Sequence, residues 1–208
     1  VAGGSACEVE VRPDGDGWRL LGPGIGVAVA ADGVLTYYDP AGGIVRSDEL
    51  STGSAGEWRL VSRHRYGASL HSLGGRSMWR LDGHSLRCWN TDPGGAWLPD
   101  DDPLSVATAG YVAVDDDGAV HCFIDNPYDA TITVTGVQAV AEFSGGPIRW
   151  HVSIGSLAEC VESFTALTGR PAVPPRWALG HHQARWGYDS SEAVRAVASG
   201  FRQHRLPL

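Results

Sequence analysis

The residues of this chain whose types could do chemistry are four cysteines, a pair of adjacent histidines and two runs of aspartates. Cys7, Cys88, Cys122 and Cys160 form no Cys-x-x-Cys pair, so their spacing argues against zinc. His181 and His182 are neighbours, and a strand would direct them to opposite faces. The aspartates at 100–102 and 115–117 lack calcium-loop spacing and are predicted to be solvated loops. The sequence therefore predicts neither a metal nor a cofactor.

Tryptophans and cysteines leave two structural questions open. Eight tryptophans in 208 residues are typical either of sugar-stacking sites or of sandwich cores, and core packing is favoured for most of them. The even cysteine count permits two disulfides. The irregular spacing and the size of the core favour reduced, buried thiols instead.

Composition and charge narrow the class of protein and its partners. Hydrophobic residues make up 43% and charged residues 19% of the chain, which is typical of a globular domain. A net charge of −8 disfavours binding to nucleic acid or to an anionic membrane. No apolar run is long enough for a membrane helix, and no signal peptide is visible in a chain that begins at Val1, so a cytoplasmic location is expected. The oligomeric state stays open.

Residues 1–155 have the pattern of an antiparallel β-sandwich. Short apolar runs alternate with turns rich in Gly, Asp and Pro. Asp32-Gly33 and Asp117-Gly118 each lie between two such runs and predict hairpins. The predicted strands are 8–12, 25–30, 34–38, 58–64, 86–89, 111–114, 120–124, 131–135, 138–143 and 148–154.

The pattern becomes helical at Ser156. Ser156 and Glu159 form a capping-box sequence before apolar residues at helical spacing. This helix and a proline-rich connection are predicted to occupy 156–175. Residues 177–186 are predicted to form a strand, and Asp189-x-x-Glu192 to begin a second helix. Strand followed by helix is the repeating unit of a parallel barrel, so 176–208 are assigned to the start of a barrel.

The segment Leu167-Thr-Gly-Arg-Pro-Ala-Val-Pro-Pro-Arg-Trp-Ala-Leu-Gly-His-His-Gln-Ala-Arg-Trp-Gly-Tyr-Asp189 resembles the junction between sandwich and barrel in glycoside hydrolase family 31. Arg87-Cys-Trp-Asn-Thr-Asp92, Asp102-Pro-Leu104 and Phe123-Ile-Asp-Asn126 resemble weaker family motifs in the same order. The resemblance implies a galactose-mutarotase-like β-sandwich followed by a (β/α)8 barrel. It also implies retaining hydrolysis of α-glucosides, with α-xylosidases and α-glucan transferases as relatives. The usual Leu-Gly-Glu is Ala68-Ser-Leu-His71 here, and Ser105 replaces a tyrosine, so the substrate is left open.

The resemblance also implies four substrate-binding residues. In the family, a sandwich loop reaches over the barrel mouth, and its Asn-x-Asp aspartate, Asp92 here, binds sugar hydroxyls at the −1 subsite. A carboxylate suits this task because it accepts two hydroxyl hydrogen bonds from a vicinal diol. Trp89 flanks this loop, and Arg185 and Trp186 follow the first predicted barrel strand at the end where barrel sites form. The alternatives are an ordinary turn at Asp92 and purely structural roles for the other three.

Retaining glycosidases need two carboxyl groups, one as nucleophile and one as acid. The family nucleophile motif, Trp-x-Asp-x-Asn-Glu, does not occur in these 208 residues. We therefore expect the catalytic aspartates to lie beyond Leu208 and the 208 residues alone to be inactive. In this interpretation the full-length protein is an α-glucosidase-like hydrolase of an α-glucoside or oligosaccharide. The alternatives are a non-catalytic carbohydrate-binding sandwich and a truncated, non-functional product.

Overall fold

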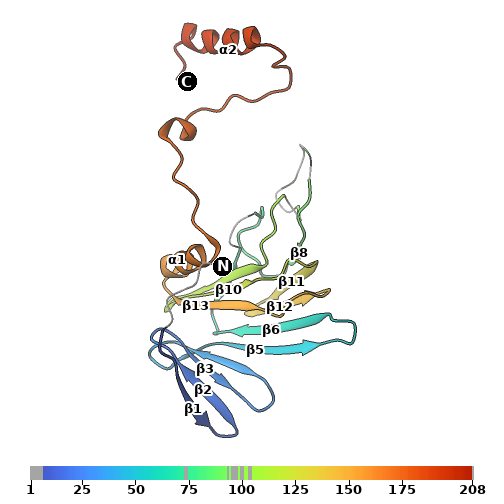
Figure 1. Cartoon of the computed structure of the whole chain (residues 1–208), viewed down its shortest axis with the longest axis vertical. Coiled ribbons are helices and arrows are strands. Elements are labelled where there is room, and N and C mark those ends of the chain that lie inside the picture. Colours follow the sequence, from blue (N-terminus) through green and yellow to red (C-terminus); the bar gives the residue numbers. More distant parts are fainter. Residues whose placement is uncertain are drawn as a thin grey trace. The chain divides into compact units, whose positions relative to one another are not determined.

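Two antiparallel sheets form the first part of the chain. The computed structural model describes residues 7–72, 75–92, 94, 98, 101–102 and 105–207, and Figure 1 shows its elements. The larger sheet has the order β1-β2-β3-β4-β5-β6-β12-β11-β8, and the smaller sheet has the order β13-β10-β9-β7. The strands are β1 (Glu10–Asp14), β2 (Gly17–Leu21), β3 (Gly26–Val29), β4 (Leu35–Tyr38), β5 (Ile44–Thr52), β6 (Trp58–His64), β7 (Ser69–His71), β8 (Ser85–Cys88), β9 (Gly110–Asp115), β10 (Gly118–Ile124), β11 (Ala130–Thr135), β12 (Gln138–Phe143) and β13 (Trp150–Gly155).

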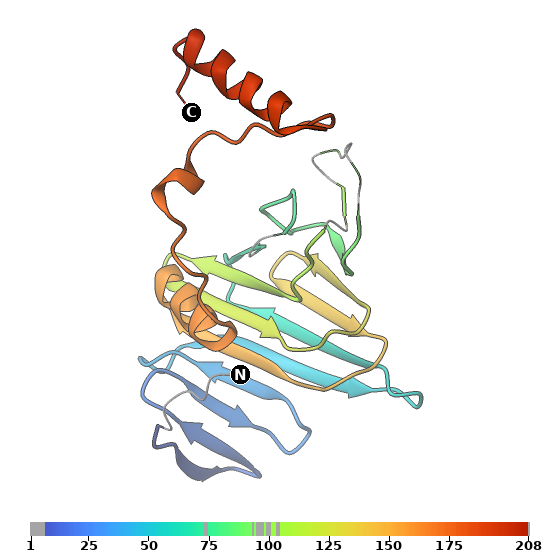
Figure 2. The same ribbon diagram turned by 45° about the horizontal axis from the view of Figure 1, so that its top comes forward.

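The main core lies between the two sheets because each strand alternates apolar and polar side chains. On β10, Cys122 and Ile124 point into this core, and on β11 Ile132 and Val134 meet them. Figure 2 shows the two sheets facing each other, with α1 (Leu157–Thr168) on the outer side of the smaller sheet. The fold is thus a sandwich with one helix on its outer face.

Three strands were absent from the sequence prediction: β2, β5 and β7. The clearest case is β5, whose sequence Ile-Val-Arg-Ser-Asp-Glu-Leu-Ser-Thr is too polar for a half-buried strand pattern. Arg46 and Asp48 on this strand are nevertheless fully buried and bind each other at 2.7 Å. A mutual ion pair makes the burial of both charges possible, and the local pattern does not reveal it.

The hairpin predicted at Asp117-Gly118 forms, but its centre is different. Asp115 pairs with Gly118 across β9 and β10, so Asp116 and Asp117 occupy the turn. The Oδ1 atom of Asp115 accepts hydrogen bonds from the backbone N–H groups of Asp117 at 2.9 Å and Gly118 at 3.0 Å. This side-chain turn gives Asp115 a structural role in the hairpin.

Helix α1 begins at the predicted capping box. The Ser156 hydroxyl accepts from the Glu159 N–H, and the Glu159 carboxylate accepts from the Ser156 N–H at 2.8 Å. The Ser156 hydroxyl also donates to this carboxylate at 2.7 Å, and this bond, together with that from the Ser156 N–H, lowers the pKa of Glu159. The helix ends at Gly169, whose φ of 102° lies in the region open to glycine. Cys160 on α1 is buried against β10 and β13, with sulfur contacts to the carbonyl oxygens of Ala119 and Ser153.

Replacing Ser156 with alanine is expected to destabilise the sandwich by about 1 kcal/mol because the Glu159 N–H loses its side-chain acceptor. The measurement is the free energy of unfolding from urea titration. Ser156→Thr keeps the hydroxyl acceptor and should stay within about 0.5 kcal/mol of the wild type. Equal losses in the two variants would contradict a capping role.

Residues 170–208 form a second compact unit. It contains a 3₁₀ helix, η1 (Arg176–Leu179), and the helix α2 (Ser191–Gln203). The strand predicted at 177–186 is wrong: η1 occupies its first part, and irregular backbone follows. A barrel strand is stabilised by hydrogen bonds to neighbouring strands. The described part of this unit, 170–207, contains no strand that could supply them.

The predicted second helix is confirmed, with a shifted start. Ser190, not Asp189, is the N-cap, and its side chain accepts from the Ala193 N–H at 3.1 Å. The ring of Phe201 on α2 lies 5.0 Å from the ring of His181, whereas His182 contacts the carbonyl oxygen of Ala178 at 2.7 Å. The two adjacent histidines therefore serve different local contacts.

The structure agrees with most of the prediction for the cysteines but not with that for the tryptophans. All four cysteines are free, and Cys88, Cys122 and Cys160 are buried as predicted, whereas Cys7 is exposed. The prediction that most tryptophans pack in the core is wrong. Of the seven tryptophans that the structure describes, five are exposed: Trp18, Trp79, Trp89, Trp177 and Trp186. No helix in the described part of the chain is long and apolar enough to cross a membrane.

Candidate functional site

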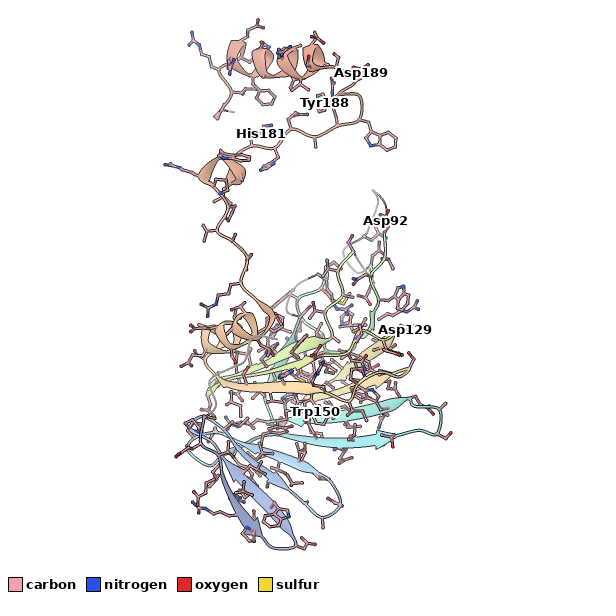
Figure 3. The ribbon with its side chains drawn as sticks, in the orientation of Figure 1. Asp92, Asp129, Trp150, His181, Tyr188 and Asp189 are labelled. Atoms are coloured by element: carbon pink, nitrogen blue, oxygen red, sulfur yellow. The ribbon has the colours of Figure 1, made fainter. Side chains whose placement is uncertain are left out.

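Asp92 lies on the loop that leaves β8, and it is exposed. Figure 3 shows it far out on this loop, at the end of the sandwich where β8 and β11 meet. Its Oδ1 atom accepts a hydrogen bond from the Gly94 N–H at 3.2 Å, so the turn anticipated at this position exists. A carboxylate has about four lone-pair positions, and a single turn contact is therefore compatible with further binding by Asp92.

A buried ion pair fastens this loop to the sandwich. Arg76 and Asp102 form a salt bridge, with side chains only 3% and 10% exposed. The Oδ2 atom of Asp102 also accepts from the backbone N–H of Arg87 at 2.7 Å. The prediction that the 100–102 run is simply solvated is therefore wrong for Asp102. The other two residues of the family-like Asp-Pro-Leu motif, Pro103 and Leu104, lie outside the described residues.

Asn90 ties the outgoing and returning parts of the loop together. Its Oδ1 atom accepts from the backbone N–H of Ala107 at 2.8 Å. Because Asn90 precedes Asp92 by two residues, this bond limits where the carboxylate can move. In this Asn-x-Asp motif, Asn90 therefore anchors the segment, and Asp92 faces outward.

Trp89 is held by an arginine on β8. The Arg87 guanidinium donates to both carboxylate oxygens of Asp129, at 3.0 and 2.8 Å, and this fork lowers the pKa of Asp129. The same guanidinium carbon lies 5.3 Å from the centre of the Trp89 ring, a cation–π distance. The Arg87 guanidinium therefore orients the Trp89 ring, which remains partly exposed to solvent.

Asp92 and Trp89 belong to the first unit, and Arg185 and Trp186 belong to the second. The Arg185 guanidinium lies 5.0 Å from the centre of the Tyr188 ring, and Trp186 is fully exposed. Neither side chain is covered within its unit. A substrate role for these two residues stays a prediction.

Several residues that shape the loop were not singled out in the sequence. Arg76 and Asp129 act through ion pairs with Asp102 and Arg87, which lie 26 and 42 positions away. Only the Asp102 motif gave a signal, and it did not reveal its partner Arg76. Among the described residues, no cluster of three His, Cys, Asp or Glu side chains could hold a metal ion.

A hollow of about 600 Å³ lies elsewhere, beside α1 on the outer face of the smaller sheet. His121, His151 and Phe164 contribute to its wall. His121 is 3% exposed, and burial, together with the charge of Arg46, lowers its pKa from 6.5 to about 4. The folded protein therefore holds this imidazole neutral.

This histidine makes stability depend on pH. Its pKa is lower in the folded than in the unfolded chain, so its contribution is complete above pH 6.5 and is lost as the pH falls towards 4. We expect the free energy of unfolding to fall less steeply between these values in His121→Phe than in the wild type. Urea titrations at pH 7 and pH 4.5 (roughly the two ends of this window) measure the difference. Identical pH dependence in both proteins would contradict the buried neutral state.

Comparisons with known proteins bear on the family. The model of the glycosyl hydrolases family 31 TIM-barrel domain matches residues 171–208. The chain is 36% identical over 129 residues to Alpha-glucosidase 2 of Bacillus thermoamyloliquefaciens, a match that covers 61% of this chain and 16% of that protein. It is 44% identical over 65 residues to Alpha-xylosidase 1 of Arabidopsis thaliana, covering 31% of this chain and 7% of that protein.

Solved structures share the fold. A family 31 dextranase mutant from Flavobacterium johnsoniae, complexed with isomaltotriose, matches with a TM-score of 0.84 and 23% identity, over 96% of this chain and 25% of that one. A family 31 α-xylosidase from a soil metagenome, complexed with xylose, has a TM-score of 0.78 and 15% identity, over 97% of this chain and 32% of that one. The predicted class, a mainly β sandwich followed by the start of a barrel, is confirmed. The matched barrel segment, the shared sequence and the shared fold together support a glycoside hydrolase family 31 protein.

Proposed function

We propose that this chain supplies the sandwich and the first barrel segment of a retaining, α-glucosidase-like glycoside hydrolase. The observation that carries the proposal is the anchored loop: Asn90 and the Arg76–Asp102 ion pair hold Asp92 outward in a chain whose residues 171–208 match the family barrel. The relatives are named α-glucosidase and α-xylosidase, and the neighbours include a dextranase. An α-linked glucoside is the substrate class that this set favours.

In this proposal Asp92 binds hydroxyl groups of the sugar at the −1 subsite and does not react covalently. Retaining hydrolysis needs a carboxylate nucleophile and a carboxylic acid about 5 Å apart on either side of the bond that breaks. The family nucleophile motif is absent from these 208 residues, so the proposal assigns both groups to other parts of the enzyme. Trp89, Arg185 and Trp186 are also assigned to substrate binding.

The chain spans 16% of the length of the Bacillus α-glucosidase that it matches, so the test begins with the native gene product. Its mass is measured in the source cells, and the protein is assayed on aryl α-glucosides, with aryl β-glucosides and α-xylosides for comparison. We expect a mass far above 22.0 kDa, preference for the α-glucoside and release of the α-anomer first. A product of 22.0 kDa that binds saccharides without hydrolysing them would instead support a carbohydrate-binding module.

A further inference from the structure

A hollow of about 430 Å³ lies at the base of the Asp92 loop, on the sandwich itself. Its volume falls in the usual range for small-molecule sites. Among the described residues that line it, none is Asp, Glu, Lys or Arg, and the lining includes Trp89, Asn90, Ala107, Asn126, Pro127 and Tyr128. Two aromatic rings and two amides around an uncharged hollow match a neutral, hydroxyl-rich ligand.

Trp89 presents its ring to solvent at this hollow, with 46% of the residue exposed. Exposed tryptophan loses hydrophobic stabilisation, yet the ring is fixed by Arg87, which Asp129 holds in turn. An exposed ring held in one orientation loses little conformational freedom when it stacks on a ligand. Trp89 therefore has the properties of a preformed stacking surface.

Tyr128 is the second exposed ring, at 51%, and the backbone positions it. Its N–H donates to Asn126 Oδ1 at 2.8 Å. The ring lies directly on the Gly145–Gly146 pair: a Cβ added at Gly146 would come within 2.5 Å of its Cδ2 atom. Because the glycines lack side chains, the ring packs against their backbone and its other side remains open.

Polar groups are available beside the rings. The Asn90 side chain uses its Oδ1 atom for Ala107, and an amide nitrogen carries two donors that suit sugar hydroxyl oxygens. The Asn126 amide instead donates to the carbonyl oxygens of Gly145 and Pro147, at 2.8 and 3.2 Å, so its role is to hold Tyr128. Stacking rings with one adjacent amide form a typical arrangement for binding pyranose rings.

We propose that this hollow binds glucose units of an α-glucan chain, separately from the −1 subsite, with Trp89 and Tyr128 as stacking surfaces and Asn90 as a hydroxyl ligand. The choice of α-linked glucose rests on the proposed function, whereas the site itself rests on the sandwich alone. The described lining residues of the hollow all belong to the first unit of this chain. Binding is therefore expected without catalysis, and the 208-residue chain is the protein to test.

The experiment titrates the 208-residue chain with maltotriose, isomaltotriose and cellotriose, and follows binding by calorimetry. We expect millimolar affinity for at least one α-linked trisaccharide and about tenfold weaker binding in Trp89→Ala and in Tyr128→Ala, because each removes a stacked ring. Trp18→Ala is the matched control, since Trp18 is 54% exposed on β2 and lies outside the hollow. It should bind like the wild type.

Three results would overturn the proposal: no binding of either α-linked trisaccharide, unchanged binding in both ring variants, or an equal loss in Trp18→Ala. Equal affinity for cellotriose would overturn the assignment to an α-glucan. Trp89→Phe keeps a ring and should recover most of the affinity, which separates stacking from damage to the loop. The proposed function is tested by the kinetics of the complete enzyme, whereas this site is tested by titration of the 208-residue chain, so failure of the hollow and failure of the Asp92 proposal give different results.

Discussion

Replacing Asp92 with alanine in the complete enzyme is expected to lower kcat/KM for an α-glucoside by about 100-fold or more. The carboxylate would accept two hydrogen bonds from adjacent sugar hydroxyls, and bonds to a charged group contribute about 1.5–3 kcal/mol each. Asp92 is exposed and its one turn contact is to Gly94, so its removal should leave the fold intact. Steady-state kinetics with an aryl α-glucoside measure the effect.

Two further variants separate substrate binding from a structural role. Asp92→Asn keeps an acceptor for the Gly94 turn but loses the charge, so it should recover the stability without recovering the activity. Asp116→Ala removes an exposed aspartate from the β9–β10 turn and should have wild-type kinetics. If Asp92→Ala turns over substrate like the wild type, the loop aspartate is a turn residue only.

The second large effect is expected in the sandwich core, where Asp48→Ala should reduce the free energy of unfolding by about 3–5 kcal/mol. Arg46 and Asp48 are 0% and 1% exposed and bind each other at 2.7 Å. Trp150 of the opposite sheet donates from Nε1 to Asp48 Oδ2 at 3.1 Å, and Figure 3 shows it on β13. Removing the carboxylate leaves a buried guanidinium without its counter-charge and breaks the link between the sheets.

The nearby exposed pair of Arg63 and Glu49 provides the matched control. It joins β5 to the neighbouring strand β6, with 2.6 Å between the charged atoms and side chains about half exposed. Glu49→Ala should change stability by no more than about 1 kcal/mol because solvent screens the pair. The double variant Arg46→Met/Asp48→Leu should recover much of the loss, since it leaves no buried charge. Equal effects of Asp48→Ala and Glu49→Ala in urea titrations would contradict this account.

The sequence by itself determined the elements whose stabilising contacts are local. Alternation and turn residues predicted β6 and β12 with their observed bounds, and the Ser156–Glu159 capping box predicted the start of α1. Such signals are reliable because the interacting groups are within a few residues of each other. The family resemblance in 167–189 likewise depends on contiguous residues, and the match over 171–208 agrees with it.

Tertiary structure alone decided which charged and aromatic residues are covered. The Arg46–Asp48 pair is buried because the second sheet closes over β5, and Asp102 is held by Arg76, 26 positions away. The strand expected at 177–186 depends on neighbours that the described residues do not supply. Most described tryptophans are exposed rather than buried. In each case residue type defines what a side chain can do, whereas partners distant in the sequence define its environment, and local patterns carry no record of those partners.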